Sequence, residues 1–274
     1  MSAGSSPAKR PPIPEGGRLA VRPGNRRLGG VSPRQLVSLV PSLTELVCSL
    51  GGREMLAGRT RFCTEPAGEV EAVPIVGGTK NPQIGRIIAL APDLVLANRE
   101  ENRREDIEAL EANGLDVLLT DPNTVATAMA MIAEVGRQIG RGEQATALNG
   151  EIMAALAEPK APPVRVFVAV WWQPLMGLGS ASYGHDLLEQ CGAVNVLAGR
   201  QRYPEVSLEE VAALKPDLIL LPDEPFPFKQ AHIAEFTAVA PARVIDGKLL
   251  WWYGARIPTA IRSLRAVVAE AGKG

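Results

Sequence analysis

Short apolar segments alternate with helical segments along most of this chain, and the alternation is interrupted once. Apolar runs bounded by Pro, Gly or Asp predict buried strands at 36–40, 73–76, 94–97, 117–119, 164–170, 194–197, 218–221 and 248–252. Between Thr124 and Glu158, two helical stretches follow each other with no strand between them. Alternating strands and helices are typical of parallel sheets covered by helices. The chain is therefore predicted to be α/β, then helical, then α/β again.

The two α/β halves repeat one local pattern. Ala89–Leu96 reads ALAPDLVL and Ala213–Leu220 reads ALKPDLIL, an offset of 124 residues. The same offset pairs Glu100 with Glu224, just beyond the two predicted strands. A helix, a Pro-Asp turn and a strand form a common connection, so coincidence is the alternative explanation. Together with the helical divider, the repeat favours two similar Rossmann-like lobes joined by a helix, with a ligand cleft between them.

This organisation divides the chain into four parts. Residues 1–35 are rich in Ser, Gly, Pro and Arg and are predicted to form a disordered tail. Residues 36–123 form the expected N-terminal α/β lobe, 124–162 a helical linker, and 163–274 a C-terminal α/β lobe. The linker is expected to end in the proline-rich stretch that holds Pro159, Pro162 and Pro163.

Charge and composition exclude several functional classes. The 29 Lys and Arg residues against 30 Asp and Glu give a net charge of −1, which argues against a nucleic-acid or anionic-membrane surface. No stretch approaches the ~20 apolar residues that span a bilayer, and the first 30 residues hold no apolar run typical of a signal peptide. The 3 Cys residues share no metal-ligand spacing. A cytoplasmic protein is expected, or a periplasmic or extracellular one if the start site is misassigned.

Residues that directly follow the predicted strands should line the cleft, because ligands of such folds lie beyond the carboxyl ends of parallel strands. These positions are rich in aromatic and charged side chains, although aromatic residues are only 4% of the chain. All four Trp lie in two adjacent pairs, and we expect one ring of each pair in the core and the other in the cleft. The predicted ligand-binding residues are Arg61, Lys80, Trp172, Tyr203, Glu224, Trp252, Tyr253 and Arg256.

In this prediction the rings stack on a flat ligand, while Arg61, Lys80 and Arg256 contact its anionic edges. His185 is a candidate axial metal ligand, and a contact with the backbone is the alternative. Motifs for phosphate loops, dinucleotide binding, nucleophile elbows and zinc proteases are absent, so binding without a required cofactor is predicted. The alternative hypothesis is an enzyme that processes a chelate or small metabolite, with Glu100, Glu224 and His185 as acid–base groups.

Four segments match a known pattern: Val37–Glu45, Ile87–Val95, Val206–Val211 and Trp252–Arg256. Together they resemble the periplasmic vitamin B12-binding and iron-chelate-binding proteins of the helical-backbone metal-receptor superfamily. The similarity runs in order from Leu36 to the end of the chain. It implies two lobes joined by one rigid helix, here Glu143–Glu158. It also implies a ligand such as cobalamin, another corrinoid, haem or a ferric siderophore, which relatives pass to an ABC importer.

Two departures from this pattern bear on transport. Importer-docking relatives present one surface glutamate on each lobe, and Glu209 fills this position in the C-terminal lobe. Gly85 stands where the carboxylate of the N-terminal lobe would lie, and losing one of two charge pairs would weaken docking on a permease. Because an export signal is also missing as written, we expect a solute-binding receptor that keeps the two binding lobes and acts in the cytoplasm.

Overall fold

A computed structural model describes residues 35–272, so the predicted disordered tail lies outside the described residues apart from Gln35. In the N-terminal lobe, all four strands are parallel and lie in the order β2-β1-β3-β4. Its strands and helices, in chain order, are β1 (Leu36–Ser38), α1 (Pro41–Ser49), β2 (Leu56–Arg59), α2 (Ile84–Ala89), β3 (Leu94–Asn98), α3 (Arg104–Ala112) and β4 (Val117–Thr120). Strand β3 is buried along its whole length, as its continuous apolar run predicts.

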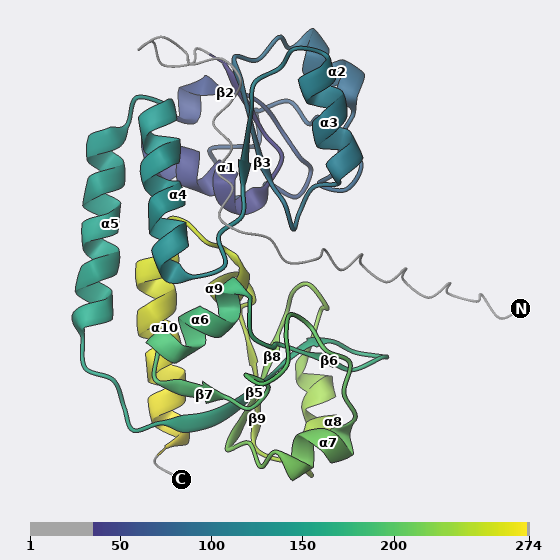
Figure 1. The fold of residues 1–274 in the computed structure, drawn as a ribbon, viewed down its shortest axis with the longest axis vertical. Coiled ribbons are helices and arrows are strands. Elements are labelled where there is room, and N and C mark those ends of the chain that lie inside the picture. Colours follow the sequence, from purple (N-terminus) through teal and green to yellow (C-terminus); the bar gives the residue numbers. More distant parts are fainter. Residues whose placement is uncertain (1–34, 273–274) are drawn as a thin grey trace, which may run out of the picture.

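The C-terminal lobe is a second sheet, in which β7, β5, β8 and β9 are parallel and β6 pairs antiparallel with β5. Helices cover it on both sides (Figure 1). Its elements are β5 (Val164–Trp171), β6 (Met176–Gly177), α6 (Tyr183–Gln190), β7 (Ala193–Asn195), α7 (Leu208–Ala213), β8 (Leu218–Pro222), α8 (Ile233–Phe236), β9 (Ala242–Ile245), α9 (Lys248–Trp251) and α10 (Ile257–Ala271). Short 3₁₀ turns lie at Arg53–Met55 and Gln230–His232.

Two antiparallel helices, α4 (Val125–Gln138) and α5 (Gly142–Ala157), run along one side of both lobes (Figure 1). Just before α5 begins, Arg141 Nη2 lies 2.8 Å from Glu54 Oε1 in the N-terminal lobe. Where α5 ends, the buried Arg265 of α10 donates from Nη1 to Ala155 O at 2.6 Å. Helix α5 is therefore tied to one lobe at each end. This arrangement confirms the predicted α/β architecture of two lobes joined by a linking helix.

Two predicted strands are wrong. Residues 73–76 form no strand and contribute only an isolated bridge, between Ile75 and Arg59. Residues 248–252 begin with helix α9, a single turn in which Leu250 N and Trp251 N both donate to Gly247 O, at 2.9 and 3.1 Å. A short apolar run bounded by glycines does not reveal its own period, so the sequence pattern could not separate a strand from a helical turn. The helical turn lets both indole nitrogens of the Trp pair reach Glu224, which an extended strand would prevent.

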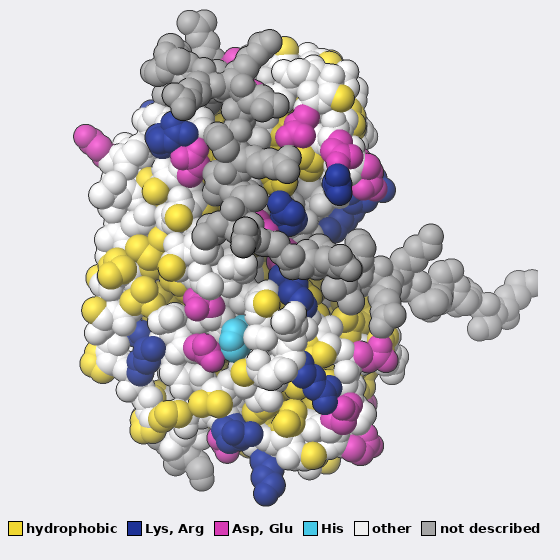
Figure 2. Space-filling model, viewed as in Figure 1, with side chains coloured by type: hydrophobic (Ala, Val, Ile, Leu, Met, Phe, Trp, Pro, Cys, Tyr) yellow, Lys and Arg dark blue, Asp and Glu magenta, His cyan; other side chains and the backbone are white. Residues whose placement is uncertain are grey.

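Surface properties of residues 35–272 agree with a protein of mixed charge. Within this part of the chain, no helix is long and apolar enough to cross a membrane. On the face shown in Figure 2, basic and acidic side chains are interspersed rather than gathered into a field of one sign. No extended basic surface for nucleic acid is visible on this face.

Candidate functional site

A cavity of about 540 Å³ lies between the two lobes, and both lobes contribute to its walls. Its volume is within the range of small-molecule sites, ~300–1,000 Å³. The N-terminal lobe contributes residues that follow β1 and β3, and the C-terminal lobe contributes the end of β5, the loop after β8, and α9. The carboxyl ends of parallel strands thus open onto one space, the arrangement expected of ligand sites in α/β folds.

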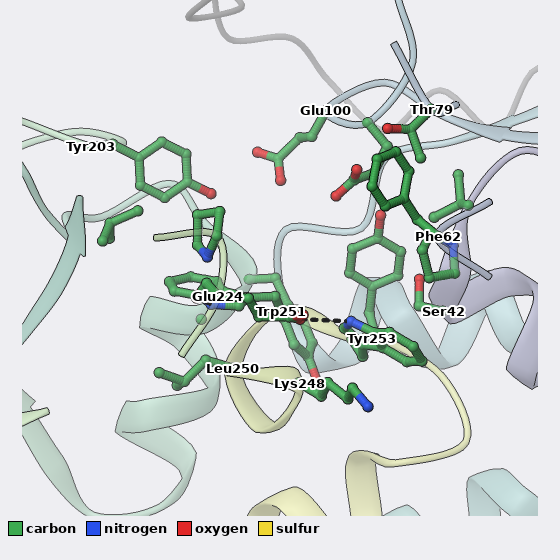
Figure 3. A pocket seen from close by; sticks show the side chains of 18 of the residues that line it. Ser42, Phe62, Thr79, Glu100, Tyr203, Glu224, Lys248, Leu250, Trp251 and Tyr253 are labelled. Atoms are coloured by element: carbon green, nitrogen blue, oxygen red, sulfur yellow. Dashed lines mark hydrogen bonds between the residues drawn. The ribbon is translucent and has the colours of Figure 1, made fainter. Parts of the chain in front are cut away.

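Aromatic rings form much of the wall on the side of the C-terminal lobe (Figure 3). Tyr183 and Tyr253 meet edge to face with ring centroids 5.7 Å apart, and Tyr203 meets Trp251 in the same way at 6.5 Å. Trp251 Nε1 donates to the main-chain oxygen of Glu224 at 2.6 Å, which holds the indole in place. From the opposite lobe, Phe62 lines the cavity although its surface is 55% exposed. Rings held in this way offer apolar contact area at low entropic cost.

Trp252 lies at the centre of a charged cluster beside the cavity. Its Nε1 donates to Glu224 Oε1 at 2.8 Å, while Lys248 Nζ and Arg256 Cζ lie 5.3 and 5.1 Å from its ring centroid. Both cations therefore meet the electron-rich surface of the indole. Burial raises the pKa of the Glu224 carboxyl, although the hydrogen bond from Trp252 opposes this shift.

Ion pairs join the two lobes around the cavity. Arg256 Nη2 lies 2.8 Å from Glu45 Oε1, and Lys248 Nζ lies 2.8 Å from Glu65 Oε1. On another side, Arg202 pairs with Glu100. Each pair combines a cation of the C-terminal lobe with a carboxylate of the N-terminal lobe, so the lobes are held together by charges that surround the cavity.

The loop after β3 presents adjacent carboxylates to the cavity. Asn98 Oδ1 accepts hydrogen bonds from the main-chain nitrogens of Glu100 and Glu101, at 2.8 and 3.3 Å, which fixes the loop. Asn102 Nδ2 donates to Thr79 O at 2.9 Å and ties this loop to the one that carries Lys80. Lys80 Nζ donates to the main-chain oxygen of Glu100.

The residues predicted to bind ligand are partly brought together. Lys80, Tyr203, Glu224, Trp252 and Tyr253 all line the cavity. Arg256 lies behind Trp252 and is paired with Glu45. The cavity-lining residues Phe62, Glu101, Tyr183, Arg202 and Trp251 were not among the predicted set. The positions of Glu101 next to the strand-end Glu100 and of Arg202 next to the predicted Tyr203 were usable signals.

Trp172 does not line the cavity, and its neighbour Trp171 does. Consecutive side chains at a strand end point to opposite faces, and here the ring of Trp172 packs on Phe236 with centroids 5.1 Å apart. Arg61 is exposed and lies outside the cavity lining, directly before Phe62.

His185 and Glu209 also lie outside the cavity lining. The His185 ring is held within its own lobe, with Nδ1 3.1 Å from Asn195 Nδ2 and Nε2 3.7 Å from Glu189 Oε1. In the described part of the chain, no group of three or more His, Cys, Asp or Glu residues is placed to hold a metal ion.

The half-buried Glu101 carboxyl predicts a free energy of unfolding that depends on pH. Burial raises its pKa above the ordinary 4.5, Glu100 adds to this and Lys80 opposes it. The folded protein therefore keeps a proton that the unfolded chain releases, so the free energy of unfolding falls as pH rises from about 4.5 through the raised pKa. We expect Glu101→Gln to unfold at a higher temperature than the wild type at pH 8 and at the same temperature at pH 4, measured by circular dichroism.

The control for this experiment is Glu111→Gln, at an exposed position of the same lobe. It should leave the unfolding temperature unchanged at both pH values. If Glu101→Gln raises the unfolding temperature equally at pH 4 and pH 8, the carboxylate charge is not the cause of the increase.

Two lobes, a helical connection that spans them and an aromatic cavity between them define a two-lobed ligand-binding protein. Residues 36–248 match the sequence profile of the periplasmic binding protein family, so the chain belongs to this family. The resemblance to the helical-backbone metal-receptor superfamily is thereby confirmed.

Relatives of known name and structure lie in the same superfamily. The vitamin B12-binding protein of Pectobacterium atrosepticum is 28% identical over 200 residues, which cover 69% of this chain and 71% of the relative. The solved structure of the periplasmic vitamin B12-binding protein BtuF of Vibrio cholerae superposes with a TM-score of 0.73 at 19% identity, covering 88% of this chain and 99% of BtuF. The periplasmic haem-binding protein RhuT from Roseiflexus sp. RS-1 gives a TM-score of 0.74 at 20% identity, covering 87% and 98%.

Proposed function

We propose that this protein binds a metal chelate, such as a corrinoid, a haem or a ferric siderophore, in the cavity between its lobes, and that it acts as a receptor rather than as an enzyme. The observation that carries the proposal is the aromatic cavity to which both lobes contribute. Rigid rings suit a flat macrocycle, and charged groups at the edges suit its polar substituents. Relatives named for binding vitamin B12 and haem support the same class of ligand.

The test is an ultraviolet–visible titration of the purified protein with cyanocobalamin, haemin and a ferric hydroxamate siderophore, each added separately. We expect one of these chelates to give a saturable spectral change with one-to-one stoichiometry, and to raise the unfolding temperature because it binds only the folded state. Failure of all three to change either the spectrum or the unfolding temperature would contradict the proposal.

A permease partner would meet different charges on the two lobes. Glu209 is exposed in the first turn of α7, and Gly85 occupies the corresponding position in α2, at the same offset of 124 residues that relates the two strand repeats. We propose that docking on an ABC importer, where it occurs, relies on the C-terminal lobe for its charged contact. The missing carboxylate of the N-terminal lobe weakens electrostatic steering toward a basic partner surface.

A further inference from the structure

The charges around the loop after β3 balance one another. Arg202 pairs with Glu100, and Lys80 Nζ donates to the main-chain oxygen of Glu100. Burial raises the pKa of the Glu101 carboxyl, and the charge of Lys80 partly offsets this shift. Each carboxylate of this loop therefore has a cation of the cavity acting on it, and this part of the wall carries no excess of charge.

The charges beside helix α9 do not balance. Lys248 Nζ lies 2.8 Å from Glu65 Oε1. Arg256 Nη2 lies 2.8 Å from Glu45 Oε1 and 3.7 Å from Glu65 Oε2. Both cations are thus committed to carboxylates of the N-terminal lobe, and within the described chain Glu224 forms no ion pair. Three carboxylates against two cations leave an excess of one negative charge, and Glu224 is the carboxylate without a partner cation.

The surroundings of Glu224 add to this excess. Burial raises the pKa of its carboxyl, the hydrogen bond from Trp252 and the charge of Lys248 oppose the shift, and Asp223 and Asp246 increase it. A carboxyl whose pKa is raised by burial and by neighbouring carboxylates is stabilised in its charged form by a new positive charge. Glu224 lines the cavity, so a ligand can bring that charge to it.

The Glu224 side chain is also held in a fixed position. Trp251 Nε1 donates to its main-chain oxygen at 2.6 Å, and Trp252 Nε1 donates to Oε1 at 2.8 Å. A Cβ atom at Gly247 would lie 2.5 Å from Glu224 Cγ, so the side chain packs directly on the backbone before α9. Figure 3 shows Glu224 beside Trp251 in the cavity wall. Because the group is held before a ligand arrives, little conformational entropy is lost on binding.

The aromatic rings next to Glu224 suit a cation as well. Lys248 Nζ and Arg256 Cζ lie 5.3 and 5.1 Å from the ring centroid of Trp252, so one indole of the pair already attracts two cations of the protein. The other indole, Trp251, lines the cavity next to Glu224. A positive group of a ligand at this point would meet a carboxylate and an aromatic ring together.

We propose that Glu224 is the counter-ion of a cationic group on the ligand, so that the cavity selects a chelate that carries a protonated amine. This inference rests on the proposed function and specifies which chelates the cavity favours. An ammonium group supplies N–H donors to the carboxylate and the positive charge that the cluster beside α9 lacks. A neutral chelate leaves the excess negative charge in place, and an anionic chelate increases it.

The experiment compares two ferric chelates that differ in one charge. Ferrioxamine B carries a terminal amine that is protonated at pH 7.5, and N-acetylferrioxamine B carries an amide in its place. The hydroxamate groups that hold the iron are the same in both. We expect the wild-type protein to bind ferrioxamine B roughly tenfold more tightly or better, in titrations followed by quenching of tryptophan fluorescence. Added salt should reduce the preference, because it screens the charge pair.

Variants connect this preference to the named carboxylate. Glu224→Gln keeps an oxygen that can accept the Trp252 hydrogen bond and removes the charge. It should weaken ferrioxamine B binding about tenfold and leave the affinity for N-acetylferrioxamine B unchanged. Equal weakening of both probes would mean that Glu224 acts through the shape of the cavity, which overturns its role as counter-ion. Glu235→Gln, at an exposed position of the same lobe outside the cavity lining, is the matched control and should change neither affinity.

The outcomes separate the two proposals. If N-acetylferrioxamine B binds as tightly as ferrioxamine B or more tightly, the amine preference is overturned and the chelate-binding function stands. Binding of the neutral cyanocobalamin or the anionic haemin, without binding of ferrioxamine B, has the same meaning. If none of these chelates binds, both proposals fall. An amine preference that persists unchanged in Glu224→Gln would overturn the assignment to Glu224.

Discussion

Trp252→Ala is expected to give the largest functional loss of any single substitution in the cavity. The indole is buried, donates to Glu224 Oε1 at 2.8 Å and lies beside the charges of Lys248 and Arg256. Its removal therefore leaves a void, removes the hydrogen bond to Glu224 and takes away the ring on which both cations pack. We expect the free energy of unfolding to fall by about 3–5 kcal/mol, as for other large-to-small aromatic substitutions in a packed site. Affinity for the chelate that binds the wild type should fall roughly 30-fold or more.

The measurements are urea denaturation followed by circular dichroism, and the absorbance titration described above. Trp252→Phe is the matched variant, because it keeps an aromatic ring and removes the Nε1 donor. It should lose about 1–2 kcal/mol of stability, the scale of one buried hydrogen bond. A Trp252→Ala protein that stays folded and binds with unchanged affinity would contradict the assignment of this ring to the ligand site.

Arg265→Ala is expected to detach the linking helix from the C-terminal lobe. The Arg265 guanidinium donates to Ala155 O, Leu156 O and Glu158 O at the end of α5, at 2.6, 3.0 and 2.8 Å, and to Gln190 O at the end of α6, at 3.2 Å. Carbonyls at a helix C-terminus lack partners within the helix and carry partial negative charge, so a buried cation stabilises them strongly. We expect the free energy of unfolding to fall by about 3 kcal/mol or more.

Arg262→Ala provides a control three residues earlier on the same helix. Arg262 Nε lies 2.7 Å from Glu158 Oε1, but the two side chains are 50% and 42% exposed. Exposed ion pairs contribute ~0–1 kcal/mol, so this variant should lose much less stability in the same urea titration. Equal losses in the two variants would refute the role of Arg265 as the anchor of α5.

The architecture could be predicted because its signals are local. The apolar run 94–97 corresponds to β3 (Leu94–Asn98), and the strand-free stretch from Thr124 to Glu158 holds α4 and α5. Strand and helix periods, proline and glycine act over a few neighbouring residues, and each signal is complete within one segment. The run 248–252 failed because it is too short to show a period, and only the packing of its indoles on Glu224 makes a helical turn preferable.

The candidate site was predicted only in part, because its geometry depends on residues far apart in the chain. The end of β8 indicated Glu224, since parallel strands bring such positions to one edge. Lys80 and Tyr253 also line the cavity, although the predicted strands before them are not formed. Whether Trp171 or Trp172 faces the cavity depends on the pleat at the end of β5. The sequence alone does not determine which side chain of that strand end points to which face.

The alternation of strands and helices, the helical divider and the repeat at an offset of 124 residues specified two lobes and a connection, because secondary structure follows from local propensity and pattern. The charge balance of the cavity, in contrast, was decided only by the tertiary structure, which brings distant residues together. Arg256 meets Glu45 across 211 residues, and Lys248 meets Glu65 across 183. Coulomb interactions depend on distance in space, so the pairing that turns Arg256, predicted to bind a ligand anion, into part of a structural ion pair exists only once the lobes are in place.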